Sequence, residues 1–137
     1  MSEATSTPGR RMAAEIAEQP QVFADLLTAR SAIGQVAERI NERSPRFALL
    51  AARGSSDHAA LYAKYLIEVL LGIPAGLVSP STTTLYGARF TLDDVLLLTV
   101  SQSGGSPDLL EVTRAARRQG ATTVAVTNTP DSELNAT

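Results

Sequence analysis

A run rich in serine and glycine, residues 99–108 with the sequence TVSQSGGSPD, separates a strand pattern from a helix pattern in this 137-residue chain. Residues 95–100 form a largely apolar run of strand length, and residues 109–116 carry apolar side chains at helical spacing. In open α/β sheets, ligands bind at the carboxyl ends of the strands, where such loops lead into helices. The run therefore predicts an α/β fold and a ligand site in the same place.

The residue types in this loop favour an anionic ligand. Free N–H groups in the first turn of a helix, together with the helix dipole, attract negative charge. Ser101, Ser103 and Ser106 add hydroxyl donors, and Gln102 adds an amide. Ser106 also suits the helix N-cap, and Pro107 suits the first helical position. Because the loop holds neither Lys nor Arg, it would bind phosphate through neutral donors. The alternative is an ordinary strand-to-helix turn built from small residues.

A second loop of the same kind occurs earlier in the chain. The apolar run 47–52 has the length of a buried strand, and it ends in Gly54, Ser55 and Ser56. A helix pattern follows over residues 59–71 and stops at Gly72. That helix is apolar nearly all round, so we expect it to be well buried.

The order of these patterns predicts the topology. Two further strands are expected at residues 75–78 and 122–127, and the alternation of strands with helices favours a parallel sheet with right-handed crossovers. A flavodoxin-like strand order, 2-1-3-4, would place the carboxyl ends of the first and third strands side by side. Both serine-rich loops would then share one pocket, which brings Ser56 next to residues 101–106.

The N-terminal part of the chain has a different sequence pattern, without predicted strands. Residues 1–10 lack periodicity and are predicted to be a disordered tail. A short helix is expected to end before Pro20, and a packing helix to follow over residues 22–40. We therefore divide the chain into a tail (1–10), a helical segment (11–44) and an α/β domain (45–137).

Composition narrows the function classes. Twelve basic and fourteen acidic residues give a net charge of −2 without a basic stripe, which offers no electrostatic case for nucleic acid. No apolar run reaches the roughly 18 residues of a membrane span. The absence of cysteine excludes disulfides and thiol chemistry, and a reducing cytoplasm is the simple expectation. We assign no metal ligands and no cofactor.

Both loops carry a resemblance to a known family. Residues 101–106 resemble the Ser-Gln/Arg-Ser-Gly-x-Ser/Thr loop of SIS (sugar isomerase) domains, and residues 54–56 resemble the family's Gly-Thr/Ser-Ser turn. The likeness is closest to the isomerase half of glucosamine-6-phosphate synthase (glutamine–fructose-6-phosphate aminotransferase) and to aminosugar-phosphate deaminases and deglycases. Residues 12–20 also resemble the start of that isomerase half.

In that family these loops wrap the phosphate of a sugar phosphate. The resemblance implies a sugar-phosphate site formed by eight residues: Gly54, Ser55, Ser56, Ser101, Gln102, Ser103, Gly104 and Ser106. It also implies a homodimer in the full-length form, whereas the expectation of no nucleic acid and no membrane partner rests on the composition.

The chain departs from the family pattern at several points. The synthases of the family often have Glu where this chain has Gly105, and this departure favours the deaminase or deglycase branch. Arg53 replaces a small residue and would either reach the phosphate or pair on the surface, the second being favoured. SIS domains usually have five strands, so the domain is expected to be truncated after its fourth. The family's acid/base Glu, ring-opening His and C-terminal Lys match no position here. We therefore assign no catalytic residue and expect this chain alone to be inactive.

Three hypotheses remain open. The chain is the sugar-phosphate-binding part of an aminosugar-phosphate isomerase, aminotransferase or deaminase acting on the glucosamine or fructose 6-phosphate class. Alternatively, it is a non-catalytic SIS sensor of a sugar phosphate, or a truncated fragment without function.

Overall fold

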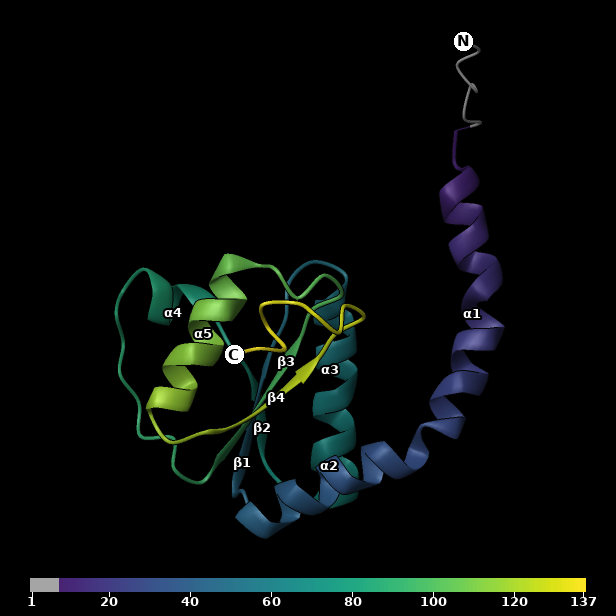
Figure 1. The fold of residues 1–137 in the computed structure, drawn as a ribbon. Coiled ribbons are helices and arrows are strands. Elements are labelled where there is room, and N and C mark those ends of the chain that lie inside the picture. The colour runs from purple at the N-terminus through teal and green to yellow at the C-terminus, as the bar shows by residue number, and fades with distance from the viewer. Residues whose placement is uncertain (1–7) are drawn as a thin grey trace. The chain divides into compact units, whose positions relative to one another are not determined.

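The computed structural model describes residues 8–137, and the chain divides into two compact units between Arg39 and Ile40 (Figure 1). The predicted tail lies outside the described residues up to position 7.

The N-terminal helices differ from the predicted ones at Pro20. Helix α1 (Arg10–Thr28) runs through this proline, so the expectation that the first helix ends before it is wrong. Proline lacks one backbone donor, but its fixed φ near −65° is itself a helical value, so the helix continues with one hydrogen bond fewer. The break falls at Ala29, whose N–H still bonds to the carbonyl of Asp25, and α2 (Arg30–Arg43) follows.

The second unit contains the predicted parallel sheet. Its strands are β1 (Phe47–Ala51), β2 (Ala75–Leu77), β3 (Val95–Val100) and β4 (Thr122–Val126), and all neighbours pair in parallel. The strand order is β2-β1-β3-β4, which confirms the flavodoxin-like order expected from the sequence. Ala51 lies opposite Thr99, so β1 and β3 end side by side at the carboxyl edge.

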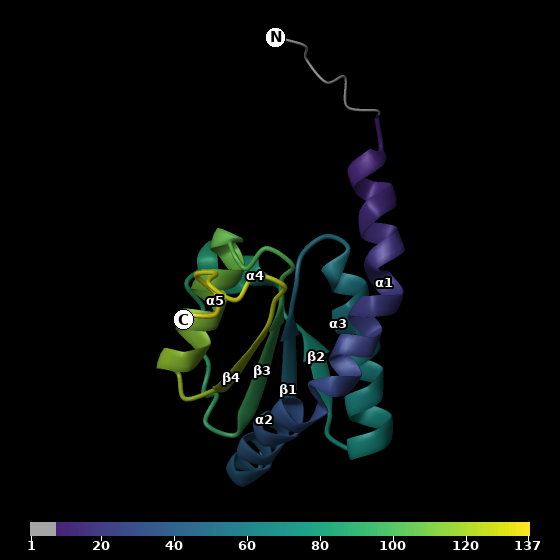
Figure 2. The same ribbon diagram turned by 45° about the vertical axis from the view of Figure 1, so that its right-hand side comes forward.

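Helices cover both faces of this sheet (Figure 2). On one face lies α3 (Ser56–Leu66), continued by a single π-helical turn, η1 (Ile67–Leu71). On the other face lie the short α4 (Pro80–Thr84) and α5 (Pro107–Arg118). The larger core joins β1 and β3 to α5 through Leu97, Leu109 and Val112. Full burial of such a side chain contributes about 1.5–3 kcal/mol, so these contacts hold α5 firmly against β3.

The helix after β1 is less buried than its composition predicts. In α3 and η1 only Ala60 is buried, and the expectation of a well-buried helix is wrong. The helix packs on the sheet through Ala60, Ala63 and Ile67, a narrow stripe of mostly small side chains. Larger apolar residues of the same helix therefore remain exposed, among them Tyr62 and Val69.

A polar contact fixes the end of this helix to the next strand. Glu68 in η1 accepts a hydrogen bond from Lys64 Nζ at 2.6 Å and another from the N–H of Ala75 at 3.3 Å, where β2 begins. The bond from Lys64, together with that N–H, lowers the pKa of Glu68 below its ordinary value of 4.5, against a smaller opposing effect of desolvation.

This contact predicts a pH dependence of stability. Because the pKa of Glu68 is lower in the folded state, its contribution is fully present above pH 4.5 and is lost as the pH falls through the folded value. We expect Glu68→Gln to reduce the free energy of unfolding at pH 7, and to reduce it by less at pH 3, where Glu68 binds more protons. Urea unfolding of both proteins at the two pH values is the measurement. An equal difference at both values would contradict this role.

Candidate functional site

The two serine-rich loops follow β1 and β3, the adjacent strands that end together. The first loop turns at Gly54, whose φ of +63° lies in the left-handed region that favours glycine. Ser55 takes the N-cap position of α3 without a side-chain capping bond, and the helix begins at Ser56. Ser55 is exposed and Ser56 is half-buried. Within residues 8–137 neither hydroxyl has a protein hydrogen-bond partner, so both are free to contact a ligand.

The second loop is shaped from within by Ser101. This residue is 5% exposed, and its Oγ accepts a hydrogen bond from the N–H of Gly104 at 3.1 Å. Ser103 is exposed, and its Oγ accepts the N–H of Gly105 at 3.4 Å. Gln102 is exposed as well. Ser101 therefore holds the loop's shape, while Gln102 and Ser103 present their side chains outward.

The second loop enters α5 as the sequence predicts. Ser106 occupies the N-cap position with an extended backbone, and Pro107 is the first helical residue. The hydroxyl of Ser106 makes no capping bond, so it is available to a ligand. Behind the loop, Thr113 of α5 donates to the carbonyl of Leu109 at 2.7 Å, and Thr99 of β3 in turn donates to Thr113 Oγ1 at 2.9 Å. This buried pair fixes the start of α5 relative to the end of β3.

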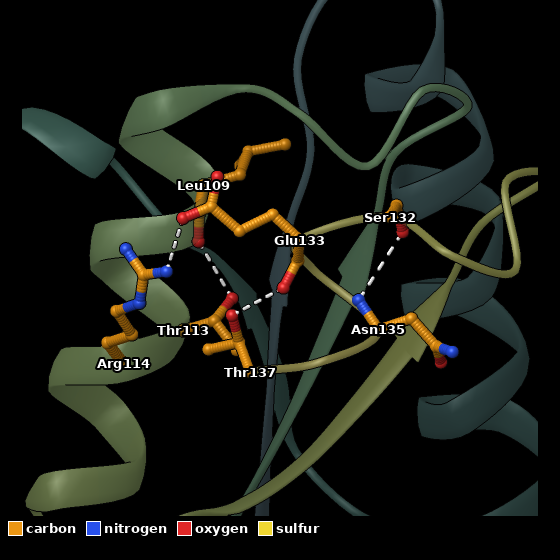
Figure 3. A network of polar contacts seen from close by, with 7 residues as sticks. All are labelled: Leu109, Thr113, Arg114, Ser132, Glu133, Asn135 and Thr137. Atoms are coloured by element: carbon orange, nitrogen blue, oxygen red, sulfur yellow. Dashed lines mark hydrogen bonds and ion pairs between the residues drawn. The ribbon is translucent and has the colours of Figure 1, made fainter.

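No sequence pattern indicated the part played by residues 127–137, which follow β4. Figure 3 shows Arg114 of α5 pointing toward Glu133 of this segment. Arg114 Nη2 lies 2.5 Å from Glu133 Oε1, so the ion pair anchors the segment on the helix. Asn135 donates its N–H to Ser132 Oγ, and Thr137 donates its hydroxyl to the carbonyl of Glu133. Its Asn, Thr, Pro, Asp and Ser residues are typical of an ordinary terminal loop, and they do not reveal that the segment packs on the second serine-rich loop.

Arg53 connects the two loops. The favoured expectation for this residue was a surface ion pair, and its side chain is 61% exposed with Nε 3.0 Å from Asp108 Oδ2. Asp108 lies in the first turn of α5, so the pair joins the loop after β1 to the helix after β3. A cavity of about 530 Å³ adjoins the pair and is also lined by Asp57, Ser79 and Ser81.

The coupling between Arg53 and Asp108 is measurable. Because the pair is solvent-exposed, a double-mutant cycle with Arg53→Gln and Asp108→Asn should give an interaction energy of about 0.2–1 kcal/mol in urea unfolding. The value should fall as salt is raised. A coupling of zero at low salt would show that the pair does not connect the loops energetically.

The described part of the chain contains neither a cluster of metal-ligating residues nor a membrane-spanning helix. Among residues 8–137 no three His, Asp or Glu side chains gather where they could hold a metal ion. No helix in the same range is both long and apolar enough to cross a membrane.

Comparison with known proteins identifies one matching domain family and relatives of one kind. The SIS domain model matches residues 43–136. The chain is 38% identical over 135 residues to the glutamine–fructose-6-phosphate aminotransferase (isomerizing) of Symbiobacterium thermophilum and 33% identical over 132 residues to that of Clostridium tetani. These matches cover 90% of this chain but only 21% of each relative, so the chain spans about a fifth of their length.

Solved structures with a similar fold have descriptions related to those of these relatives. A candidate phosphosugar isomerase from Silicibacter pomeroyi DSS-3 superposes with a TM-score of 0.87 at 44% identity, over 92% of this chain and 39% of that one. The C-terminal domain of glucosamine-fructose-6-phosphate aminotransferase from Francisella tularensis gives a TM-score of 0.79 at 26% identity, over 98% of this chain and 39% of that one.

Proposed function

The chain belongs to the SIS domain family, and on that premise we propose that residues 45–137 bind a phosphorylated sugar or aminosugar of the glucosamine or fructose 6-phosphate class. One observation carries the proposal: two loops with free hydroxyl groups stand next to each other at the carboxyl ends of β1 and β3. Ligands bind at this position in open α/β sheets.

The phosphate would be held by neutral donors. Ser56 from the first loop and Ser103 and Ser106 from the second supply hydroxyl groups, and Gln102 supplies an amide. Gly54, Ser101 and Gly104 complete the site by shaping the two loops, and the exposed hydroxyl of Ser55 would be a further donor. Hydrogen bonds to a charged group contribute about 1.5–3 kcal/mol each, so a few such donors are enough for binding without a Lys or Arg in the second loop.

The proposed reaction context is aminosugar-phosphate chemistry of the isomerase, aminotransferase, deaminase or deglycase type. Proton transfer between C1 and C2 of a sugar phosphate needs a general base with a pKa near neutrality. We assign no residue of this chain to that role, and we expect residues 1–137 to bind without turnover. A cytoplasmic location and a homodimeric full-length form belong to the same proposal.

Calorimetric titration of the protein with fructose 6-phosphate and glucosamine 6-phosphate tests this function. We expect saturable binding of at least one of them and no binding of unphosphorylated fructose, because the site is built around the phosphate. Equal responses to fructose and fructose 6-phosphate would contradict the proposal. Conversion of either phosphosugar by this chain alone would contradict the assignment of no catalytic residue.

A further inference from the structure

The backbone carbonyl groups of the second serine-rich loop turn toward the segment that follows β4. The carbonyl of Gln102 accepts hydrogen bonds from the N–H of Asn128 at 3.2 Å and from the hydroxyls of Thr127 and Thr129, each at 3.3 Å. The carbonyl of Gly104 accepts the N–H of Leu134 at 3.0 Å. Two acceptors of the loop are thus satisfied by one segment that lies far along the sequence.

That segment is itself firmly held. Leu134 is 2% exposed and Ser132 is 7% exposed. Ser132 lies so close to Gly104 that a Cβ atom at Gly104 would stand 2.3 Å from its Oγ. On its other side the segment is tied to α5 by the ion pair between Arg114 and Glu133. The carbonyl groups of the loop therefore meet a buried and anchored partner.

We propose that residues 127–134 position the second serine-rich loop for anion binding, with Thr127 and Thr129 as positioning residues; this proposal rests on the proposed function. A carbonyl oxygen that faced a phosphate would repel it, since both carry negative charge on oxygen. The segment draws the carbonyl groups of Gln102 and Gly104 to its own side. The loop then presents N–H and O–H groups to the ligand, and it loses little conformational entropy on binding.

The test replaces each threonine with valine, which lacks the hydroxyl donor but has nearly the same shape. Thr129→Val removes one hydroxyl bond to the carbonyl of Gln102. The double variant Thr127→Val/Thr129→Val removes both hydroxyl bonds, together with the bond that Thr127 Oγ1 accepts from the N–H of Thr129 at 3.1 Å. We expect the dissociation constant for fructose 6-phosphate to rise about threefold in the single variant and about tenfold in the double variant. Thr28→Val is the matched control, because Thr28 is exposed as Thr129 is, and it donates to a backbone carbonyl, that of Asp25, within α1. Its affinity should equal that of the wild type.

A second readout works without ligand and separates this proposal from the proposed function. Amide hydrogen exchange at residues 103–105 should be faster in the double variant, and by a larger factor than at the amides of β1 and β3, which report the loss of global stability. Wild-type affinity together with unchanged exchange in the double variant would overturn the positioning role. If the wild type binds no sugar phosphate, the proposed function fails, and the exchange rates still decide whether this segment holds the loop.

Discussion

Gly104→Ala should lower the free energy of unfolding by about 2–4 kcal/mol, because the alanine would meet both a strained backbone and a filled space. Gly104 has a φ of +63°, a conformation that L side chains rarely adopt. The new Cβ would stand 2.3 Å from Ser132 Oγ and 2.4 Å from Ser132 Cβ. Ser132 is buried, so it cannot swing into solvent. Urea unfolding monitored by circular dichroism measures the change.

Variants at two other glycines separate the effect of backbone strain from the effect of crowding by Ser132. Gly54 has the same φ of +63°, but no atom lies within 4 Å of the place that an alanine Cβ would take, so Gly54→Ala should cost only the backbone strain, about 1–2 kcal/mol. Gly105 has neither constraint, and Gly105→Ala should leave stability nearly unchanged. Adding Ser132→Gly to Gly104→Ala should recover the part due to crowding. Equal losses for Gly104→Ala and Gly54→Ala would show that contact with Ser132 is unimportant.

Ser56→Ala and Ser103→Ala should each weaken sugar-phosphate binding by about 1–3 kcal/mol, or roughly 5- to 150-fold in the dissociation constant. The two residues come from different loops, and each would donate a hydroxyl to the phosphate. Neither side chain donates a hydrogen bond within residues 8–137, and Ser103→Ala removes only the long, exposed bond from the N–H of Gly105 at 3.4 Å, so the folded state should lose little stability. Calorimetric titration with fructose 6-phosphate gives the affinity.

The control for these two variants is Ser31→Ala, an exposed serine in α2. It should bind fructose 6-phosphate as the wild type does. Unchanged affinity in both Ser56→Ala and Ser103→Ala would contradict the assignment of the two loops to one phosphate site.

The strands, their order and the adjacency of the two loops follow from local sequence patterns. Apolar runs at β1 and β3 predict buried parallel strands because such strands are covered on both faces. Handedness and strand order then leave few topologies, and the flavodoxin-like one puts Ser56 near residues 101–106. The positions of Ser106 and Pro107 at the start of α5 were also predictable, since N-cap chemistry is local.

Other features depend on contacts between distant residues, and only the tertiary structure decided them. Helix α1 continues through Pro20, although the local sequence predicts that it ends there. Much of α3 is exposed, although its apolar composition predicts burial. Both differences arise because the packing of a helix is set by its neighbours as well as by its own sequence. Likewise, nothing near Arg53 shows that Asp108 lies 3.0 Å away. The sequence predicted that Gly104 would serve a ligand or a turn, whereas the fold also uses its missing side chain to admit Ser132. By itself the sequence determined which loops meet, because periodicity and caps are local. The fold determined what holds those loops in place, because close packing joins residues that share no local pattern.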